Sequence, residues 1–377
     1  MNTPIRILHV VSKMSFGGVQ SVIMNYYRNI DRTKIQFDFV VQSDEEFEFN
    51  NEIRALGGKI YKVTPLHINR KKFSNELYNI LISNPQYKTI QVHQNYLNII
   101  PLIVSKKAGV KNRISHSHNN YKATSIYKCF QRFIFRNIIS LYATKYFACS
   151  SSAGIWLHGN KFLNNNKSFI MNNAINMEKF RFDNVSRKRI RKELDIDNKY
   201  VFIHVGMFGE AKNHNYLIEI FYEISQYNSE VTLLLLGEGE NKEKIHELVK
   251  EKGIEDKVIF LGKKNNVNEY FSAADSLIFP SKNEGLPVVV VEAQVNGIKC
   301  YVSKEAVPNE IDITNNIKFI SIHKNPKYWA DNIINEIDFD NERKNNVIIK
   351  NNGYDISIQA KRLQNYYEEL NKWKINW

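Results

Sequence analysis

The 377-residue chain is poor in cysteine and contains no long hydrophobic run. Its three cysteines, Cys129, Cys149 and Cys300, are odd in number and widely spaced, which argues against a disulfide framework and a cysteine-ligated metal. No uncharged apolar stretch reaches the roughly 18 residues of a membrane span, and the N-terminus leads from Pro4 straight into an apolar strand pattern. These absences predict a cytoplasmic protein.

Acidic residues are also missing from a long internal stretch, since none occurs between Glu76 and Glu178. Residues 1–180 carry 24 Lys and Arg against 9 Asp and Glu, whereas residues 181–377 carry 28 against 30. Such an excess attracts an anionic surface. Nucleic acid is a poor candidate because no recognised binding motif is present. An anionic membrane surface that carries a lipid-phosphate acceptor is the expected partner.

Residues 125–146 mix aromatic and aliphatic side chains with three basic residues at four-residue steps, Lys128, Arg132 and Arg136. This spacing places the three charges on one face of a helix. The pattern is typical of a helix that lies in a membrane interface. A helix that packs on the core and turns its basic face to solvent explains the pattern equally well.

The length of the chain predicts two domains, because a single hydrophobic core stops growing at a smaller size. Alternating strand and helix patterns begin at residues 6–11 and begin again at residues 200–205, after an apparent linker at 182–197. Such alternation is typical of parallel, doubly wound sheets. The fold class is therefore α/β.

The stretch from Ile278 to Ser303 carries the most specific chemistry. A short apolar run ends at Pro280, and Pro287 suits the first turn of a helix, whose free N–H groups would face an anion such as phosphate. Glu284 is better suited to sugar hydroxyls, and Glu292 would accept hydrogen bonds from a vicinal diol such as a ribose. An ordinary strand–helix unit with two surface glutamates is the alternative.

Several segments recur in an order known from one enzyme family. They are FGGVQ at 16–20, ACSSSAGIWLHG at 148–159, NNAINMEKF at 172–180, GMFGEAKNH at 206–214, LGEG at 236–239, FLG at 260–262 and EGLPVVVVEA at 284–293. Together they span nearly the whole chain. The pattern resembles the retaining glycosyltransferases of family 4, which have the GT-B fold and an EX7E signature. It is most similar to bacterial enzymes of capsule, exopolysaccharide and O-antigen synthesis.

The resemblance implies two Rossmann-like domains that face each other across a cleft. Residues 1–181 would bind the acceptor, residues 182–355 would bind the nucleotide sugar, and a C-terminal helix within 356–377 would pack back on the first domain. The implied activity transfers a sugar, with retention, from a nucleotide diphosphate sugar to a hydroxyl of a lipid-linked saccharide. A UDP-sugar is the expected donor, and the inner face of the cell membrane is the expected location.

The resemblance also assigns residues to the site. Glu284, Lys212 and a histidine of the SHSHN segment, His116 or His118 with preference for His118, would act in catalysis. His93 would line the acceptor side, next to the membrane-directed Lys128, Arg132 and Arg136. The further donor-binding positions are Gly17, Gly18, Gly206, Met207, Gly237, Gly239, Gly262, Lys263, Gly285, Leu286, Pro287 and Glu292.

One position departs from the family. Met207 stands where an arginine would join Lys212 in binding the diphosphate, which leaves open a non-catalytic relative that binds a nucleotide sugar or glycan as a partner subunit. A nucleotide-sugar epimerase of the same architecture is a further alternative. The spacing of His116 and His118 resembles a metal-binding pair, but no third ligand is identifiable, so we expect neither metal nor cofactor. The sequence indicates no oligomeric state.

Overall fold

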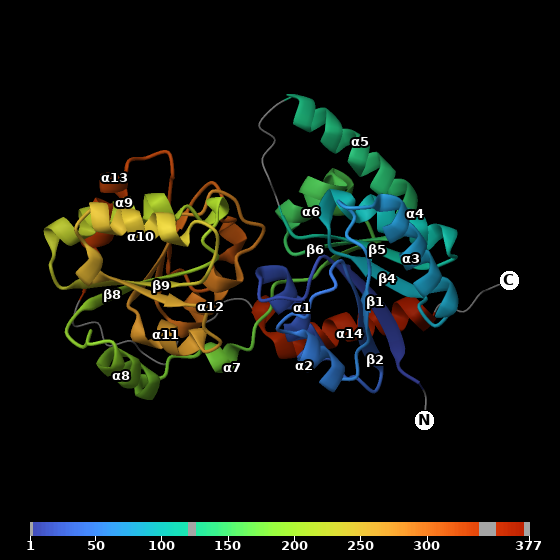
Figure 1. The fold of residues 1–377 in the computed structure, drawn as a ribbon, viewed down its shortest axis with the longest axis horizontal. Coiled ribbons are helices and arrows are strands. Elements are labelled where there is room, and N and C mark those ends of the chain that lie inside the picture. Colours follow the sequence, from blue (N-terminus) through green and yellow to red (C-terminus); the bar gives the residue numbers. More distant parts are fainter. Residues whose placement is uncertain (1–2, 120–125, 339–351, 373–377) are drawn as a thin grey trace. The chain divides into compact units, whose positions relative to one another are not determined.

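The computed structural model describes residues 3–119, 126–338 and 352–372. The chain divides into two compact units, Met1–Ile175 with Gly353–Trp377, and Asn176–Asn352. Each unit is a parallel sheet with helices packed on its faces (Figure 1). The prediction of two doubly wound α/β domains is confirmed.

The first unit contains a seven-stranded sheet in the order β3-β2-β1-β4-β5-β6-β7. Its strands are β1 (Ile5–Val11), β2 (Ile35–Val41), β3 (Ile60–Lys62), β4 (Thr89–Val92), β5 (Asn112–Ser117), β6 (Lys145–Ala148) and β7 (Ser168–Ile170). The strand order reverses between β1 and β4, which pair in parallel with Ile7 opposite Thr89. Ligands of doubly wound sheets bind at the carboxyl ends of the strands beside such a reversal.

Two helices of this unit begin at a side-chain cap. Asn69 accepts a hydrogen bond from the Lys72 amide at the start of α3, and Ser150 accepts one from the Ala153 amide at the start of α6. The helices are α1 (Gly18–Asn29), α2 (Asn50–Ala55), α3 (Arg70–Ser83), α4 (Ile99–Lys107), α5 (Ile126–Tyr142), α6 (Ser151–His158) and, at the end of the chain, α14 (Ile356–Lys372).

Helix α14 packs against α1 of the same unit (Figure 1). The Tyr367 hydroxyl donates a hydrogen bond to Gln91 Oε1 on the neighbouring sheet, and Ile175 forms a bridge with Asp355 just before the helix. The predicted return of the C-terminal helix to the first domain is confirmed.

The second unit contains a six-stranded sheet in the order β10-β9-β8-β11-β12-β13. Its strands are β8 (Tyr200–Val205), β9 (Val231–Leu236), β10 (Val258–Gly262), β11 (Ser276–Phe279), β12 (Lys299–Ser303) and β13 (Ile317–Ile320). Its helices are α7 (Met177–Phe180), α8 (Asn184–Glu193), α9 (His214–Tyr227), α10 (Lys242–Glu251), α11 (Val267–Ala273), α12 (Val288–Asn296) and α13 (Pro326–Ile334). Here the order reverses between β8 and β11.

The predicted linker at 182–197 is wrong, because α8 occupies most of it. Asp183 accepts hydrogen bonds from the Val185 and Ser186 amides and so begins the helix. Arg187 and Arg191 of α8 then bind Asp275, at 2.7 and 3.2 Å. The charge-rich segment forms a helix, and two of its arginines, one buried and one half-buried, bind the helix to the second unit.

Candidate functional site

Two glycines after β9 press against the loop that follows β8, residues 206–213, which we call the β8 loop. A Cβ on Gly237 would lie 2.0 Å from the Gly206 carbonyl oxygen, and a Cβ on Gly239 would lie 2.7 Å from the Phe208 amide nitrogen. Both glycines have positive φ, 147° and 159°. A side chain at either position is therefore excluded by contact and by backbone conformation.

The β8 loop is bonded to the loop after β11, residues 280–287, which we call the β11 loop. The Lys282 amide donates to the Ala211 carbonyl at 2.8 Å, and Asn213 Nδ2 donates to the Pro280 carbonyl at 3.1 Å. Asn213 adopts a left-handed conformation, with φ of 61°, and its side chain does not cap α9. These contacts fix the two loops at the strand-order reversal of the second unit.

Lys212 and Glu284 meet between these loops. The lysine side chain passes Gly206, where an added Cβ would lie 3.1 Å from its methylene carbons, and its ammonium lies 4.6 Å from the centroid of the Phe279 ring. Its Nζ then lies 2.7 Å from Glu284 Oε1. With side-chain exposures of 23% and 13%, the pair is largely shielded from water. The structure thus brings together the predicted cation and the predicted carboxylate.

The start of α12 is enclosed by the chain. Gly285, Leu286 and Pro287 are all buried, and Pro287 directly precedes the helix without a side-chain cap. The first N–H groups of an α-helix have no partner within the helix, and the helix dipole makes this end favourable for an anion. A helix therefore begins where the sequence predicts one, directly after Pro287.

Glu292 lies one turn further along α12. Burial raises the pKa of its carboxyl to about 7, and the Lys179 ammonium of α7 acts in the opposite direction. Within the described residues, no hydrogen bond or ion pair reaches the carboxyl group. Hydroxyl donors from a diol would stabilise the ionised form of such a group.

The Met207 side chain is 66% exposed. The position at which the family resemblance implies an arginine is therefore accessible to solvent. At the end of β10, Gly262 has φ of 68°, and a Cβ on this residue would lie 3.0 Å from Glu238 Oε1. Lys263 follows this glycine directly.

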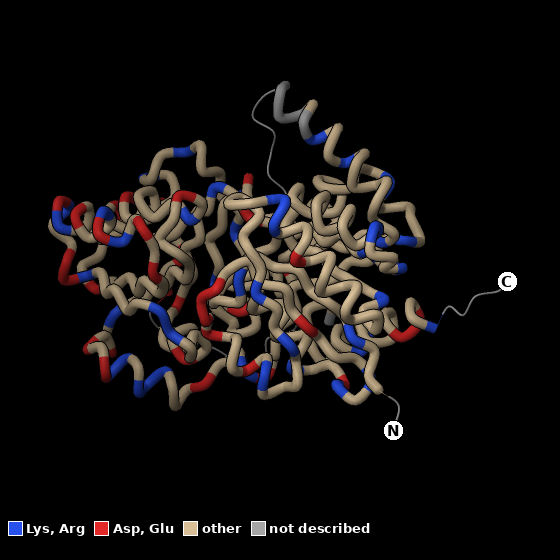
Figure 2. The backbone as a smooth tube through the Cα atoms, turned by 45° about the vertical axis from the view of Figure 1, so that its right-hand side comes forward, with Lys and Arg blue, Asp and Glu red and all other residues tan. Residues whose placement is uncertain are grey.

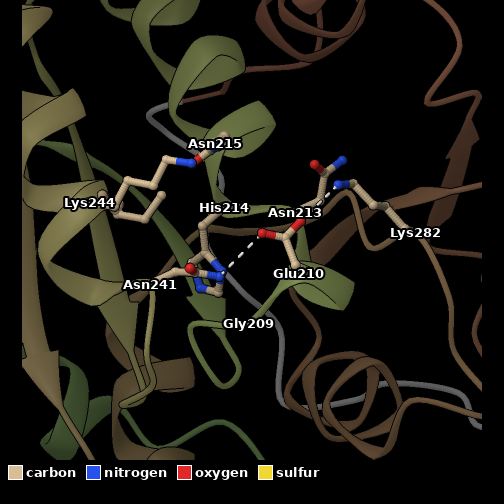
Figure 3. A pocket seen from close by; sticks show the side chains of 9 residues that line it. Gly209, Glu210, Asn213, His214, Asn215, Asn241, Lys244 and Lys282 are labelled. Atoms are coloured by element: carbon tan, nitrogen blue, oxygen red, sulfur yellow. Dashed lines mark hydrogen bonds and ion pairs between the residues drawn. The ribbon is translucent and has the colours of Figure 1, made fainter.

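A pocket lies on another side of the β8 loop, next to α9 and α10 (Figure 3). Glu210 points between two of its lining residues, with its carboxylate oxygens 3.5 Å from Lys282 Nζ and 3.5 Å from Asn241 Nδ2. The Lys282 ammonium is thus engaged by a carboxylate.

In the first unit, four buried histidines gather around the carboxyl ends of β1, β4 and β5. His9 lies on β1, His93 directly follows β4, His116 lies on β5 and His118 directly follows β5. His9 Nδ1 is 3.0 Å from His93 Nε2, and His93 Nδ1 is 2.8 Å from His118 Nε2. The rings of His116 and His118 are 3.9 Å apart, which confirms that both project to the same side of the strand.

His116 is held from within the protein. Because Gln91 Oε1 accepts a hydrogen bond from Tyr367, the Gln91 amide nitrogen is oriented to donate to His116 Nδ1, at 2.9 Å. His116 is 1% exposed, whereas His118 is 7% exposed. Of the two histidines, His118 therefore lies nearer to the surface.

Burial lowers the pKa of each of these histidines. The pKa of His9 and of His118 falls to about 3, and the pKa of His93 and of His116 lies well below its ordinary value. All four rings are therefore neutral near pH 7. A neutral imidazole donates one hydrogen bond and accepts one.

The expectation that no third ligand accompanies His116 and His118 is wrong. His93 joins them, and one ring nitrogen from each of the three lies within 4.8 Å of the others. Sequence spacing hides this residue because β4 and β5 are neighbours in the sheet, with Val92 opposite Ser115. The group contains no carboxylate, and the hydrogen bond between His93 Nδ1 and His118 Nε2 already uses two of its nitrogens.

The Gly17–Gly18 turn leads into α1. Gly17 is extended, with φ of −177°, and a Cβ on Gly18 would meet no atom within 4 Å. Neither glycine is required by backbone conformation, and α1 begins without a side-chain cap. The open space over Gly18 leaves room for a group that approaches the backbone.

Two basic residues of α5, Arg132 and Arg136, are directed toward α6. Arg136 donates to the carbonyls of Ile155 and Trp156 at the end of α6, at 2.7 and 2.8 Å, and the Arg132 guanidinium lies 5.9 Å from the Trp156 ring centroid. The side chain of Lys128 lies outside the described residues. The expectation of a membrane-directed Arg136 and the alternative of a solvated basic face are therefore both wrong for this residue.

The outward face of α5 is apolar. Phe130, Phe133 and Leu141 are 61%, 62% and 69% exposed, and no acidic residue lies on the helix (Figure 2). No helix in the described part of the chain combines the length and apolarity needed to cross a bilayer.

Comparison with known proteins agrees with this architecture. Residues 186–354 match the family described as Glycosyl transferases group 1. The putative glycosyltransferase EpsF of Bacillus subtilis (strain 168) is 29% identical over 333 residues, which cover 87% of this chain and 86% of EpsF. The capsular polysaccharide biosynthesis glycosyltransferase CapH of Staphylococcus aureus is 24% identical, over 96% of this chain and 98% of CapH.

Two further comparisons concern an acceptor type and the fold. A UDP-Gal:alpha-D-GlcNAc-diphosphoundecaprenol alpha-1,3-galactosyltransferase of Escherichia coli is 22% identical over 80% of both chains. The crystal structure of Anabaena Alr3699/HepE in complex with UDP and glucose superposes with a TM-score of 0.77 at 16% identity, over 97% of this chain and 100% of that one. The chain thus has the GT-B fold, carries a glycosyl transferases group 1 domain at residues 186–354, and is a glycosyltransferase.

Proposed function

We propose that the chain is a retaining glycosyltransferase of family 4 with the EX7E signature. It transfers a sugar from a UDP-sugar to a hydroxyl of a lipid-linked saccharide during synthesis of a bacterial surface polysaccharide. The donor class is supported by the UDP and glucose in the HepE complex and by the UDP-Gal in the name of the E. coli relative. The acceptor class is supported by the diphosphoundecaprenol in the same name.

The contact between Lys212 and Glu284 is the observation that carries this proposal. A diphosphate at the uncapped start of α12 would accept hydrogen bonds from the helix amides and from the Lys212 ammonium. Once the ammonium has moved to the phosphate, the Glu284 carboxylate becomes free to accept sugar hydroxyls. In this proposal Lys212 would stabilise the leaving group and Glu284 would position the sugar.

Glu292 completes the donor side. Its carboxyl has no hydrogen-bond partner among the described residues, and its raised pKa of about 7 reflects burial. A ribose diol would supply two hydroxyl donors to this group. His118, a neutral donor at the end of β5, would contact the donor sugar, as the family resemblance implies.

The acceptor side would work at the inner face of the cell membrane. The exposed apolar face of α5 and the excess of Lys and Arg in the first 180 residues suit an interface with anionic lipids. Lysines flank this region on α4 and at the start of β6, at Lys106, Lys107 and Lys145. A lipid-linked acceptor would enter from that surface.

Transfer would require no divalent metal. The diphosphate charge would be balanced by Lys212 and the start of α12, and the three-histidine group in the first unit contains no carboxylate of the kind that Mg²⁺ prefers. Addition of a chelator should therefore leave turnover unchanged. A restored rate on addition of Mg²⁺ or Mn²⁺ would contradict this part of the proposal.

A donor screen and a product analysis test the proposal. UDP, GDP and ADP compounds are compared for thermal stabilisation, and we expect the UDP compounds to stabilise the protein most. Nuclear magnetic resonance (NMR) of the product should show the anomeric configuration of the donor sugar. An inverted product would exclude retention.

Met207, at the position where the family resemblance implies an arginine, favours a second candidate, a partner subunit that binds a nucleotide sugar or glycan without catalysis. That candidate predicts thermal stabilisation without nucleotide release in the presence of any acceptor. An epimerase would form a new nucleotide sugar in the absence of an acceptor. The same assays therefore separate all three functions.

A further inference from the structure

Three of the buried histidines form a hydrogen-bonded row, His9–His93–His118, which we call the histidine row. The row crosses three neighbouring positions of the sheet, from β1 past the end of β4 to the end of β5. Its two contacts are 3.0 and 2.8 Å long. Each contact joins Nδ1 of one ring to Nε2 of the next, so the rings are linked in a single direction.

The central ring determines the proton positions of the others. A neutral imidazole has one N–H and one lone pair, and both nitrogens of His93 are engaged. If His93 donates from Nδ1 to His118 Nε2, it must accept at Nε2 from His9 Nδ1. If it donates from Nε2, both bonds reverse. Only these two arrangements satisfy the whole row.

The inner end of the row selects between them. His9 is fully buried, its ring stacks against Phe39 at 5.5 Å, and its Nε2 has no hydrogen-bond partner. In the reversed arrangement this nitrogen would carry an N–H that is buried without an acceptor. His116 Nε2 already carries a buried N–H without a partner, because Gln91 donates to its Nδ1, and the reversed arrangement would add a second such group. The arrangement in which His93 donates outward avoids this cost.

In that arrangement, His118 accepts at Nε2 and therefore carries its proton on Nδ1. Nε2 is engaged by His93, so Nδ1 is the ring nitrogen left for a ligand. The His118 amide is held separately by Asn95 Oδ1, at 3.3 Å, which fixes the backbone that carries the ring. Both the ring orientation and the proton position are thus set by neighbouring residues.

We propose that His9 and His93 are positioning residues that hold His118 as the neutral Nδ1–H tautomer, so that it donates a hydrogen bond to a substrate oxygen. The idea rests on the proposed function for the identity of that substrate, a nucleotide sugar or its acceptor. The tautomer itself is independent of any activity. His116 lies outside the row, because Gln91 engages its Nδ1.

The direct test is ¹⁵N NMR of the full chain labelled at histidine. His118 is assigned from the signals that disappear in His118→Gln. We expect a protonated Nδ1 and an unprotonated Nε2 for His118 in the wild type. In His93→Phe, which keeps a ring but removes both hydrogen bonds, the two His118 tautomers should both be populated.

His158→Phe is the matched control, because His158 is a buried histidine of the same unit outside the row. It should lower stability to a similar extent and leave the His118 tautomer unchanged. A protonated Nε2 in the wild type, or an unchanged tautomer in His93→Phe, would overturn the proposal. Retention of one zinc ion bound by His93, His116 and His118 would overturn it as well.

Kinetics provide the second measurement. With a working donor and acceptor, His93→Phe and His9→Phe should each lower kcat about tenfold and change the donor KM less than about twofold. A proton on the wrong nitrogen of His118 weakens stabilisation of the transition state more than it weakens binding of the donor. A change in KM alone would contradict a positioning role. If the wild type shows no turnover, the proposed function fails, but the NMR measurement still decides whether the row fixes the tautomer.

Discussion

The Lys212 ammonium lies 2.7 Å from the Glu284 carboxylate in the absence of a donor. Each group is therefore the counter-ion of the other in the free protein, although the proposed mechanism assigns them to different parts of the substrate. A bound diphosphate must draw the lysine away from the glutamate. The ion pair is thus expected to open when the donor binds, which frees the carboxylate for the sugar.

Replacement of Lys212 by alanine should weaken binding of nucleotide diphosphates. A charge-assisted hydrogen bond contributes about 1.5 to 3 kcal/mol, so the Kd for UDP should rise roughly 10-fold to 150-fold. Isothermal titration calorimetry of UDP measures the change. Lys252→Ala is the control, because Lys252 directly follows α10 and pairs with Glu219. An unchanged Kd in Lys212→Ala would remove Lys212 from the site.

Met207→Arg should have the opposite effect. The side chain is exposed, so an arginine fits without disturbing the core, and it would add a second cation beside the diphosphate. We expect a Kd for UDP that is about tenfold lower, with little change in thermal stability without ligand. If the affinity does not rise, position 207 does not face the diphosphate in this chain.

Glu292 should make stability depend on pH. Its pKa is about 7 in the folded chain against an ordinary 4.5, so the folded state binds more protons between these values. The contribution of Glu292 to the free energy of unfolding should therefore fall as pH rises from about 4.5 to 7, whereas the buried histidines, whose pKa is lowered, contribute in the opposite direction and are the same in wild type and variant. Glu292→Gln removes this dependence, and the variant should gain stability relative to the wild type across that window. Urea unfolding at several pH values measures it, with Glu251→Gln as a surface control, and parallel curves would contradict the assignment.

Membrane attachment is expected to depend on the apolar face of α5. The double substitution Phe130→Ser and Phe133→Ser should lower binding to anionic vesicles at least about tenfold, because two exposed aromatic rings lose their burial in the interface. Co-sedimentation measures the bound fraction. Ile82→Ser with Ile358→Ser, two exposed apolar residues on α3 and α14, is the matched control. Equal losses in both double variants would argue against α5 as the attachment surface.

The two-domain α/β architecture could be predicted from the sequence because strand and helix periodicities are local properties. The approach of Lys212 to Glu284 was accessible only through the family resemblance, since the two residues lie on loops after different strands. His93 shows the limit of arguments from sequence spacing. It lies 25 residues before His118 in the sequence, and the pairing of β4 with β5 brings the two residues together. The helix at 184–193 could not be predicted from its charged composition, which is typical of a linker. Two of its arginines bind Asp275, a contact that the sequence pattern does not reveal.

Nucleotide release by wild type and Glu284→Gln tests the central claim most directly. The purified protein is incubated with a panel of UDP-, GDP- and ADP-sugars and a membrane extract that supplies the acceptor, and Glu251→Gln is the surface control. We predict release from one donor class that requires the acceptor and falls at least about 100-fold in Glu284→Gln, because the group that holds the sugar at the transition state is lost. Equal release by wild type and Glu284→Gln would contradict the account.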